Sequence, residues 1–349
     1  MNKAVVAPHG IGTAWRDVKN VSSSKRVLFY EGEDTRMLRA AIAAADAGLC
    51  RPVVLGRVSE MLTTARCLGL DLSAVEMRDV NDEVLRDNQL DEYGRPCHRG
   101  GLDTEFLSSR AHASALLVRS GWVDAAIGGA RTSSADILGA GMSCIGLAPG
   151  RTTVSGAVFL DTQRPDVGSG GTLAFADAVV TPMPTVEQLV DIAAATAHSW
   201  RSLMRTEPRI GFLSFSTKGS SKSRHVDRVR DALRLFQRTF PDEVVDGELQ
   251  FDAAVSGAVA ARKSASGAVG GSANVLVFPS LDSANIAYKV AEQLGGSKAR
   301  AFLQGLARPF ADVSRGCTVD DIVTTVGMLL YDVLQDRESP GSHYQGEMN

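Results

Sequence analysis

The chain has 349 residues, of which 44% are hydrophobic and 22% are charged, and this composition excludes disorder along the whole length. Lys and Arg number 37 against 40 Asp and Glu, and this balance argues against a nucleic-acid or membrane-surface protein, which shows a basic excess. At roughly 150 residues per domain, the length predicts two domains.

Expected strands and helices alternate along the first part of the chain. Apolar runs at 25–30, 52–56 and 123–128 predict buried strands, and helical patterns at 34–48 and 103–120 separate them. Continuous apolar strands divided by helices are typical of a mainly parallel sheet covered on both faces. The sequence therefore predicts an α/β fold.

A second series of elements follows Ala148-Pro149-Gly150, a candidate crossing point between domains. Thr185 and Gln188 form a capping-box pattern that opens an expected helix. The helices are expected at 186–204, from about 282 to the glycine pair at 295–296, and at 320–335. Further strands are expected at 152–160, 172–180, 209–216, 249–255 and 274–280.

The apolar content and the cysteines indicate a cytoplasmic protein. No apolar run approaches the ~20 residues of a membrane-spanning helix, and the N-terminal apolar stretch is too short for a signal-peptide core of ~7–15 residues. The five cysteines never show C-x-x-C spacing, so we expect reduced thiols rather than disulfides or a zinc site. The six histidines are dispersed, and no metal site is expected.

The segment 209–223 is the first candidate for chemistry. An expected strand leads into a polar turn whose small residues let backbone N–H groups approach an anion, and a lysine adds a positive charge. An ordinary helix start explains the same pattern. The turn residues are Thr217, Lys218, Gly219 and Ser220.

A similar strand-to-helix turn occurs at 128–136. Ser133 and Ser134 can donate hydroxyl groups to a ligand there. The alternative interpretation is a plain helix N-cap.

The third candidate segment is 304–322. Arg315 follows Ser314 in a glycine-containing turn, and a guanidinium beside a hydroxyl suits a phosphate or a developing oxyanion. Asp321 can accept a proton, but Thr318 and Asp321 also satisfy a capping box, and the residues alone leave both interpretations open. Cys317 is expected to be a small buried residue rather than a nucleophile.

At this segment the chain resembles the phosphate acetyltransferases (phosphotransacetylases). Matches follow in the same order from about residue 25 to 335. The C-terminal signature is matched by Gln304-Gly305, Arg308-Pro309, Asp312, Ser314-Arg315-Gly316-Cys317 and Asp320-Asp321-Ile322. Other matching stretches are Glu31-Gly32-Glu33-Asp34, Ser133-Ser134-Ala135-Asp136, Phe175-Ala176-Asp177, 213–220, 246–250 and 274–289.

The resemblance implies reversible acetyl transfer between acetyl phosphate and coenzyme A, with CoA as substrate and no cofactor. It implies that Asp321 is the general base that takes the CoA thiol proton, so that the thiolate attacks the acetyl carbonyl in a ternary complex. Arg315 is expected to hold the phosphoryl group, and Ser314 to hydrogen-bond the reacting centre. The six turn residues at 133–134 and 217–220 are expected to bind substrate.

The resemblance also implies two α/β domains with mainly parallel sheets and an active cleft between them. The first domain is expected to be discontinuous, at 1–150 and 301–349, and the second, at 151–300, to form a homodimer. Ser314, Arg315 and Asp321 are then expected to face the turn at 217–220.

The chain departs from the family pattern at the expected CoA site. Gly139 stands where family members usually carry Arg, and Arg131 just upstream is a candidate replacement. The element that binds CoA phosphates is only approximate around Arg95, His98 and Arg99. Two alternatives stay open: a phosphate butyryl- or propionyltransferase of the same family, and a non-catalytic acyl-CoA-sensing module.

Overall fold

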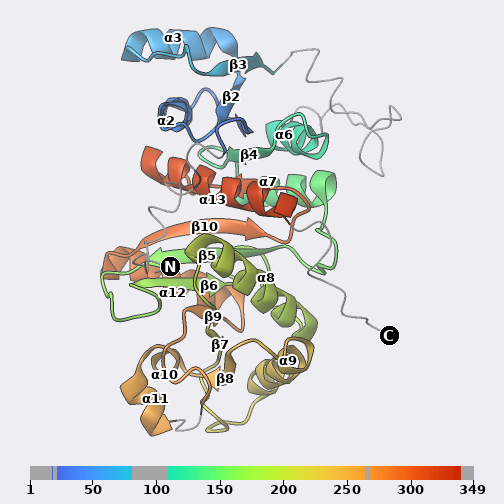
Figure 1. Ribbon diagram of the computed structural model, residues 1–349, viewed down its shortest axis with the longest axis vertical. Coiled ribbons are helices and arrows are strands. Elements are labelled where there is room, and N and C mark those ends of the chain that lie inside the picture. The colour runs from blue at the N-terminus through green and yellow to red at the C-terminus, as the bar shows by residue number, and fades with distance from the viewer. Residues whose placement is uncertain (1–17, 19–21, 81–108, 264–266, 339–349) are drawn as a thin grey trace, which may run out of the picture. The chain divides into compact units, whose positions relative to one another are not determined.

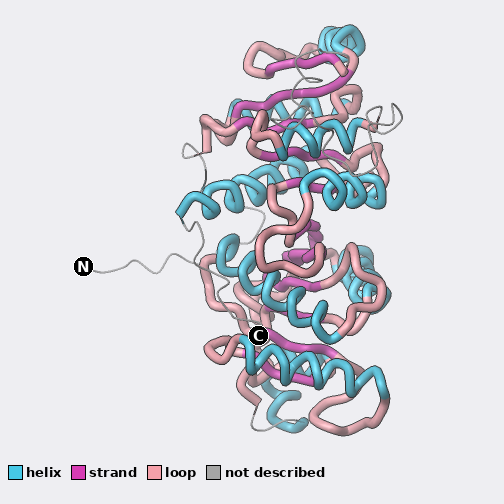
Figure 2. Tube along the Cα trace, turned by 90° about the vertical axis from the view of Figure 1, so that its right-hand side faces the viewer, coloured by secondary structure: helices cyan, strands magenta, loops and turns pink. Residues whose placement is uncertain are grey.

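The computed structural model describes residue 18 and residues 22–80, 109–263 and 267–338. Over these residues it divides into two compact units, which we name by their place in the chain. Gly150–Gly305 forms the central unit, and Ala14–Pro149 with Leu306–Gly341 forms the terminal unit. In Figures 1 and 2 the strands of each unit run between helices. No helix among the described residues is long and apolar enough to cross a membrane.

The terminal unit contains a five-stranded sheet of order β11-β4-β1-β2-β3, in which all neighbours are parallel. The apolar runs at 25–30, 52–56 and 123–128 form β1, β2 and β4, as predicted. Helices α2 and α13 pack against each other and on the sheet, while α6, α7 and the π-helix η2 form a second packed group. The elements are β1 (Arg26–Phe29), α2 (Thr35–Asp46), β2 (Arg51–Gly56), α3 (Val58–Leu68), β3 (Glu76–Asp79), α6 (Arg110–Arg119), β4 (Ala125–Gly128), α7 (Ser134–Ala140), η2 (Gly141–Ile145), β11 (Phe310–Asp312) and α13 (Val319–Glu338).

The central unit contains a six-stranded sheet of order β10-β5-β6-β9-β7-β8. Its β10, β5 and β6 are antiparallel neighbours, and its remaining pairs are parallel. The prediction of two mainly parallel α/β sheets is thus confirmed. The elements are β5 (Ser155–Asp161), β6 (Thr172–Ala176), α8 (Val186–Met204), β7 (Ile210–Leu213), α9 (Arg224–Thr239), β8 (Val245–Leu249), α10 (Phe251–Val255), α11 (Gly257–Lys263), β9 (Val275–Val277), α12 (Leu281–Gly295) and β10 (Lys298–Gln304).

Helix α8 begins as the sequence predicts. The Thr185 N–H donates to Gln188 Oε1 at 2.9 Å, and the Gln188 N–H donates to Thr185 Oγ1 at 3.2 Å. This capping box satisfies two N–H groups that have no partner within the helix. The buried face of α8 packs on the sheet, where the Trp200 ring stacks on Phe159 at 6.1 Å between centroids.

Two of the differences between the prediction and the structure have a clear physical cause. The segment 249–255, expected to be a strand, is mostly helix: β8 covers Val245–Leu249 and α10 covers Phe251–Val255. The strand stops because the Gln250 N–H donates to Thr217 Oγ1 at 3.0 Å instead of to a neighbouring strand. The return to the terminal unit, expected at 301, comes after Gly305, because β10 pairs with β5 up to Gln304.

Candidate active site

The terminal unit brings three loops to the carboxyl ends of adjacent parallel strands. The chain continues from β1 to β2 and β3 on one side, and then to β4 on the other side of β1. Ligands of open α/β sheets bind at such a switch point, outside the carboxyl ends of the strands. The loops after β1, β4 and β11 therefore frame a candidate site, and they contain 30–34, 129–133 and 313–318.

The loop after β11 and the first turn of α13 carry three of the predicted residues. The side chains of Ser314 and Arg315 are exposed, and Ser314 Oγ accepts the Gly316 N–H at 3.2 Å. Asp321 lies in the first turn of α13. Its Oδ2 accepts the N–H and the hydroxyl of Thr318 at 3.0 and 2.8 Å, while the Asp321 N–H donates to Thr318 Oγ1 at 3.2 Å. The capping box exists, and it also fixes the orientation of the carboxylate.

The Cys317 thiol of this loop is buried, as the sequence predicts. Burial raises its pKa to about 11, although the Arg36 guanidinium acts in the opposite direction. A thiol with so high a pKa is a poor nucleophile at neutral pH. Cys317 therefore packs rather than reacts.

The turn after β4 is held by a carboxylate that sequence reasoning did not single out for a role. Glu31, in the loop after β1, is buried and accepts three backbone N–H groups, from Gly129 at 3.1 Å, Arg131 at 3.1 Å and Thr132 at 2.6 Å. Gly129 has φ 111°, and a Cβ there would clash with Asp312 Oδ1, so only glycine fits. The turn is thereby fixed in one conformation.

The two predicted serines of this turn have protein partners. Ser133 caps α7: its Oγ accepts the Asp136 N–H at 3.2 Å and donates to Asp136 Oδ2 at 2.7 Å. The exposed Ser134 hydrogen-bonds the Asp312 carboxyl group. Ser133 therefore acts as the helix N-cap, while the exposed Ser134 hydroxyl lies beside the Asp312 carboxyl group.

Asp312, at the end of β11, is a half-buried acid inside this group of loops, and its Oδ1 is fully buried. Its pKa is raised to about 6, because burial and, to a smaller extent, the Glu31 charge raise it and outweigh the Ser134 hydrogen bond and the Arg315 charge, which lower it. Asp312 Oδ1 and the hydroxyl of Tyr30 are buried with no hydrogen-bond partner among the described residues. A group titrating near 6 beside the predicted phosphate ligand Arg315 marks this edge as electrostatically unusual.

The predicted anion-binding turn of the central unit is built differently from the expectation. Each backbone N–H from 216 to 221 donates to an acceptor of the protein: Ser214 Oγ, Ser220 Oγ, Glu248 O, Glu248 Oε1, Thr217 O and Ser216 Oγ. The expected cradle of backbone N–H groups is therefore wrong. What the turn can offer a ligand is therefore its side chains. Lys218 at φ 47° and Gly219 at φ 89° give the turn its left-handed backbone.

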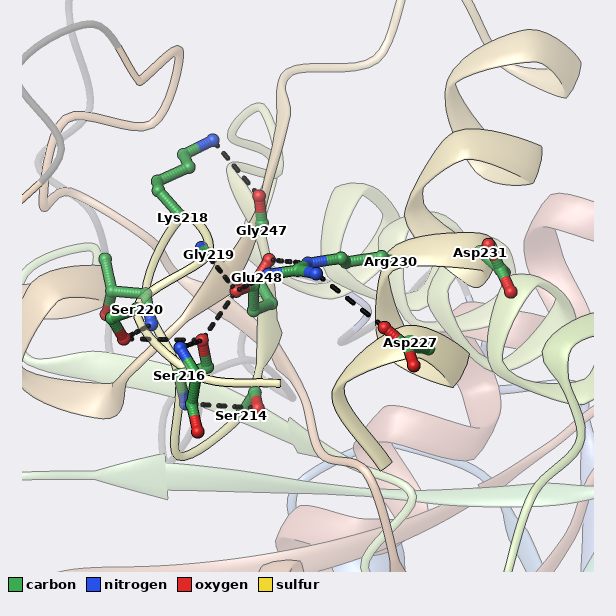
Figure 3. A network of polar contacts seen from close by, with 12 residues as sticks. Ser214, Ser216, Lys218, Gly219, Ser220, Asp227, Arg230, Asp231, Gly247 and Glu248 are labelled. Atoms are coloured by element: carbon green, nitrogen blue, oxygen red, sulfur yellow. Dashed lines mark hydrogen bonds and ion pairs between the residues drawn. The ribbon is translucent and has the colours of Figure 1, made fainter. Parts of the chain in front are cut away.

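Glu248, next to the end of β8, holds this turn (Figure 3). It accepts from Ser216 Oγ at 2.7 Å, the Gly219 N–H at 2.8 Å and Arg230 Nε at 2.8 Å. Burial alone would raise its pKa, but the hydrogen bonds from Arg230, Gly219 and Ser216 outweigh burial and lower it to about 2. Glu248 therefore stays ionised and fixes the loop.

The remaining predicted residues are placed as follows. The Lys218 ammonium forms an ion pair with Asp246 and donates to the Gly247 carbonyl at 3.1 Å. Arg131 is exposed, and its charge helps to lower the pKa of Asp34. Arg95 lies outside the described residues. A Cβ added at the exposed Gly139 would meet no heavy atom within 4 Å, so the position normally held by Arg is open space.

The terminal unit thus brings Ser133, Ser134, Arg131, Ser314, Arg315 and Asp321 to one edge, while the turn at 217–220 belongs to the central unit. That the two sets face each other stays a prediction. Glu31 and Glu248, which hold these two turns, lie within stretches that match the family pattern. That match is the sequence signal that could have identified them. Among the described residues no group of three His, Cys, Asp or Glu side chains is arranged to hold a metal ion.

Comparison with known proteins agrees with these features. The family model described as "Phosphate acetyl/butaryl transferase" matches residues 14–329. A phosphate acetyltransferase of Clostridium acetobutylicum is 36% identical over 323 residues, covering 91% of this chain and 96% of the relative. Phosphotransacetylases from Streptococcus pyogenes and Staphylococcus aureus are similar in structure. Their TM-scores are 0.81 and 0.79, their identities 31% and 30%, and both comparisons cover 93% of this chain and 98% of the other.

Proposed function

The chain belongs to the phosphate acetyl/butaryl transferase family, and from this premise we propose that it is an acyltransferase that moves an acetyl group reversibly between acetyl phosphate and coenzyme A. The observation that carries the proposal is the placement of Ser314, Arg315 and Asp321 at the switch-point edge of the terminal unit. The family's reaction requires a base, a cation and a hydroxyl group, and all three lie within eight residues of one loop and helix start.

In the proposed mechanism, the Asp321 carboxylate takes the proton from the CoA thiol. The resulting thiolate attacks the acetyl carbonyl carbon, a C–S bond forms, and the C–O bond to phosphate breaks with its electron pair leaving on the phosphate. A free thiol has a pKa near ~8.5, so a positioned base raises the thiolate fraction. The Thr318 hydrogen bonds support this role, because they hold the carboxylate in one orientation.

Arg315 and Ser314 act on the acyl phosphate. The exposed Arg315 guanidinium holds the phosphoryl oxygens, and the Ser314 hydroxyl donates to the reacting carbonyl group. Phosphate is already a good leaving group, so orientation and charge stabilisation are the remaining tasks, and the proposed step uses no metal or cofactor.

We assign CoA binding to the polar residues around these loops. Arg95, Arg131 and the Ser133 and Ser134 hydroxyls are proposed to contact CoA phosphates from the terminal unit. From the central unit the side chains of Thr217, Lys218 and Ser220 contribute, and Gly219 allows the turn its conformation. The Lys218–Asp246 ion pair means that an incoming phosphate competes with a carboxylate for the ammonium group.

The test is thioester formation by purified protein from CoA and a panel of acetyl, propionyl and butyryl phosphates, with and without a metal chelator. We expect acetyl phosphate to react fastest and the chelator to have no effect. A higher turnover with butyryl phosphate would replace acetyl by butyryl specificity. Tight acetyl-CoA binding without any thioester formation would favour the sensing module and refute the enzyme.

We propose that the protein is a homodimer formed through α12 of the central unit. Ile286, Val290 and Leu294 are spaced by four residues, so they lie along one face of this helix, and they are 62%, 49% and 84% exposed. A second copy of the chain presents the same stripe. Light scattering should give twice the chain mass for the protein and a monomer for Leu294→Glu. The control Leu68→Glu, at an exposed apolar position of α3, should remain dimeric.

We propose a cytoplasmic location. Cys50, Cys67, Cys144 and Cys317 are free thiols. Thiols of this kind persist in reducing compartments.

A further inference from the structure

Arg36, in the first turn of α2, uses every N–H of its guanidinium group. The carboxylate of Asp34 accepts Nε at 3.0 Å and Nη2 at 2.9 Å. The remaining donors reach three backbone carbonyls: Nη1 binds Arg315 O at 2.6 Å and Cys317 O at 3.1 Å, and Nη2 binds Ala130 O at 3.1 Å. A guanidinium carries five N–H donors in a rigid plane, and all five have acceptors.

These acceptors lie on the two loops that hold the predicted catalytic and binding residues. Arg315 and Cys317 belong to the loop after β11, directly before α13, and Ala130 belongs to the turn after β4. The Arg36 charge is neutralised by Asp34, whose pKa its hydrogen bonds lower below the ordinary range. Arg36 is therefore a cross-link between loops, and its donors are not available to a substrate phosphate.

The same turn after β4 is held from its N–H side by Glu31. Glu31 and Arg36 both follow β1 and are only five residues apart. Glu31 accepts N–H groups of the turn after β4, and Arg36 donates to carbonyl groups of that turn and of the loop after β11, so one short segment holds both loops. The arrangement exists only when β1, β4 and β11 are adjacent, as they are in the sheet.

We propose that Arg36 is a positioning residue. Its planar guanidinium, held by Asp34, fixes the position of the 315–317 backbone relative to the turn at 130. It thereby positions the Arg315 side chain and the start of α13. This inference rests on the proposed acyltransferase function for its effect on turnover. The cross-link itself is a property of the fold.

The loss of Arg36 should lower kcat more than it raises KM. A displacement of about 1 Å at reacting groups costs on the order of 100-fold in rate, and the side chains that contact substrate remain present. Arg36→Lys keeps the charge but lacks the planar fork, so we expect nearly the same loss in kcat as for Arg36→Ala. Asp34→Asn keeps the cap on the Arg36 N–H but removes one acceptor of the fork, and kcat should fall less.

The matched control is Arg39→Ala, because Arg39 lies one turn further along α2 and is exposed. It should keep the wild-type kcat. Millimolar guanidinium chloride, compared with sodium chloride at equal ionic strength, should restore part of the kcat of Arg36→Ala. A variant that is merely less stable would not regain activity from a denaturing ion.

A second measurement does not depend on activity. Iodoacetamide alkylation of Cys317, followed by peptide mass spectrometry with buried Cys50 as internal standard, should become severalfold faster in Arg36→Ala and stay unchanged in Arg39→Ala. Unchanged Cys317 alkylation together with wild-type kcat in Arg36→Ala would overturn the proposal. If the wild type forms no thioester with any acyl phosphate, the proposed function fails, and the alkylation rates alone decide whether Arg36 fixes the loop.

Discussion

The substitution Asp321→Asn separates the two roles that one carboxylate has in this site. Asp321 Oδ2 accepts two hydrogen bonds from Thr318, and the side-chain oxygen of asparagine can accept both in the same place. The substitution removes a negative charge at the helix N-terminus, and this lowers the free energy of unfolding by about 0.3–1 kcal/mol. It also removes the general base, and this lowers kcat on the order of 100- to 10,000-fold.

Thr318→Ala is the matched control. It removes the hydroxyl that accepts the Asp321 N–H at 3.2 Å, and the loss of such a cap costs about 0.5–2 kcal/mol. The Thr318 N–H still donates to Asp321 Oδ2 at 3.0 Å, so the base keeps one of its two hydrogen bonds. This variant should therefore be less stable than Asp321→Asn but lose much less activity.

The assay compares thermal unfolding with the initial rate of acetyl-CoA formation, normalised to folded protein. We expect the two variants to rank in opposite orders in the two measurements. If Asp321→Asn retains its activity per folded molecule while its melting temperature falls as far as that of Thr318→Ala, Asp321 is a cap and the general-base assignment is refuted.

Three further predictions concern other residues. Gly139→Arg should lower the KM for CoA without lowering the melting temperature, since a Cβ there meets open space and Arg is a better helix former than Gly; an unchanged KM for CoA would show that another group serves in its place. Glu248 ionises near 4.5 when unfolded and near 2 when folded, so its stabilisation is complete above pH 4.5 and is lost as the pH falls to 2. Glu248→Gln should lower the free energy of unfolding by about 2 kcal/mol at pH 7, allowing for solvent screening at the partly exposed Arg230. The stability of this variant should also depend less on pH between 4.5 and 2. Denaturant unfolding as a function of pH measures both effects. Asp312 has the opposite sign: folding raises its pKa from 3.8 to about 6, so its ionisation costs stability as the pH rises through this window. Asp312→Asn should therefore have a free energy of unfolding up to about 3 kcal/mol higher than the wild type above pH 6 and equal to it below pH 4. The same difference at both pH values would show that the ionisation of Asp312 is not the cause.

Local patterns predicted the elements that depend on neighbouring residues. The capping box at Thr185 and Gln188 needs only residues three apart, and the helix it opens begins and ends where expected. The mistaken strand at 249–255 shows the limit. Its alternating residues suit a strand, but Gln250 donates to Thr217, 33 residues earlier, and the chain turns into a helix.

The sequence by itself determined the α/β class and the order of residues that makes the 314–321 segment recognisable. The tertiary structure alone decided how that segment is held. Arg36 binds carbonyl groups 94, 279 and 281 residues away, and Glu31 binds N–H groups about 100 residues away. Every residue except proline carries the same backbone carbonyl and N–H, so no residue type in a sequence marks such a partner. Only the adjacency of β1, β4 and β11 in the folded sheet brings these groups within hydrogen-bond distance.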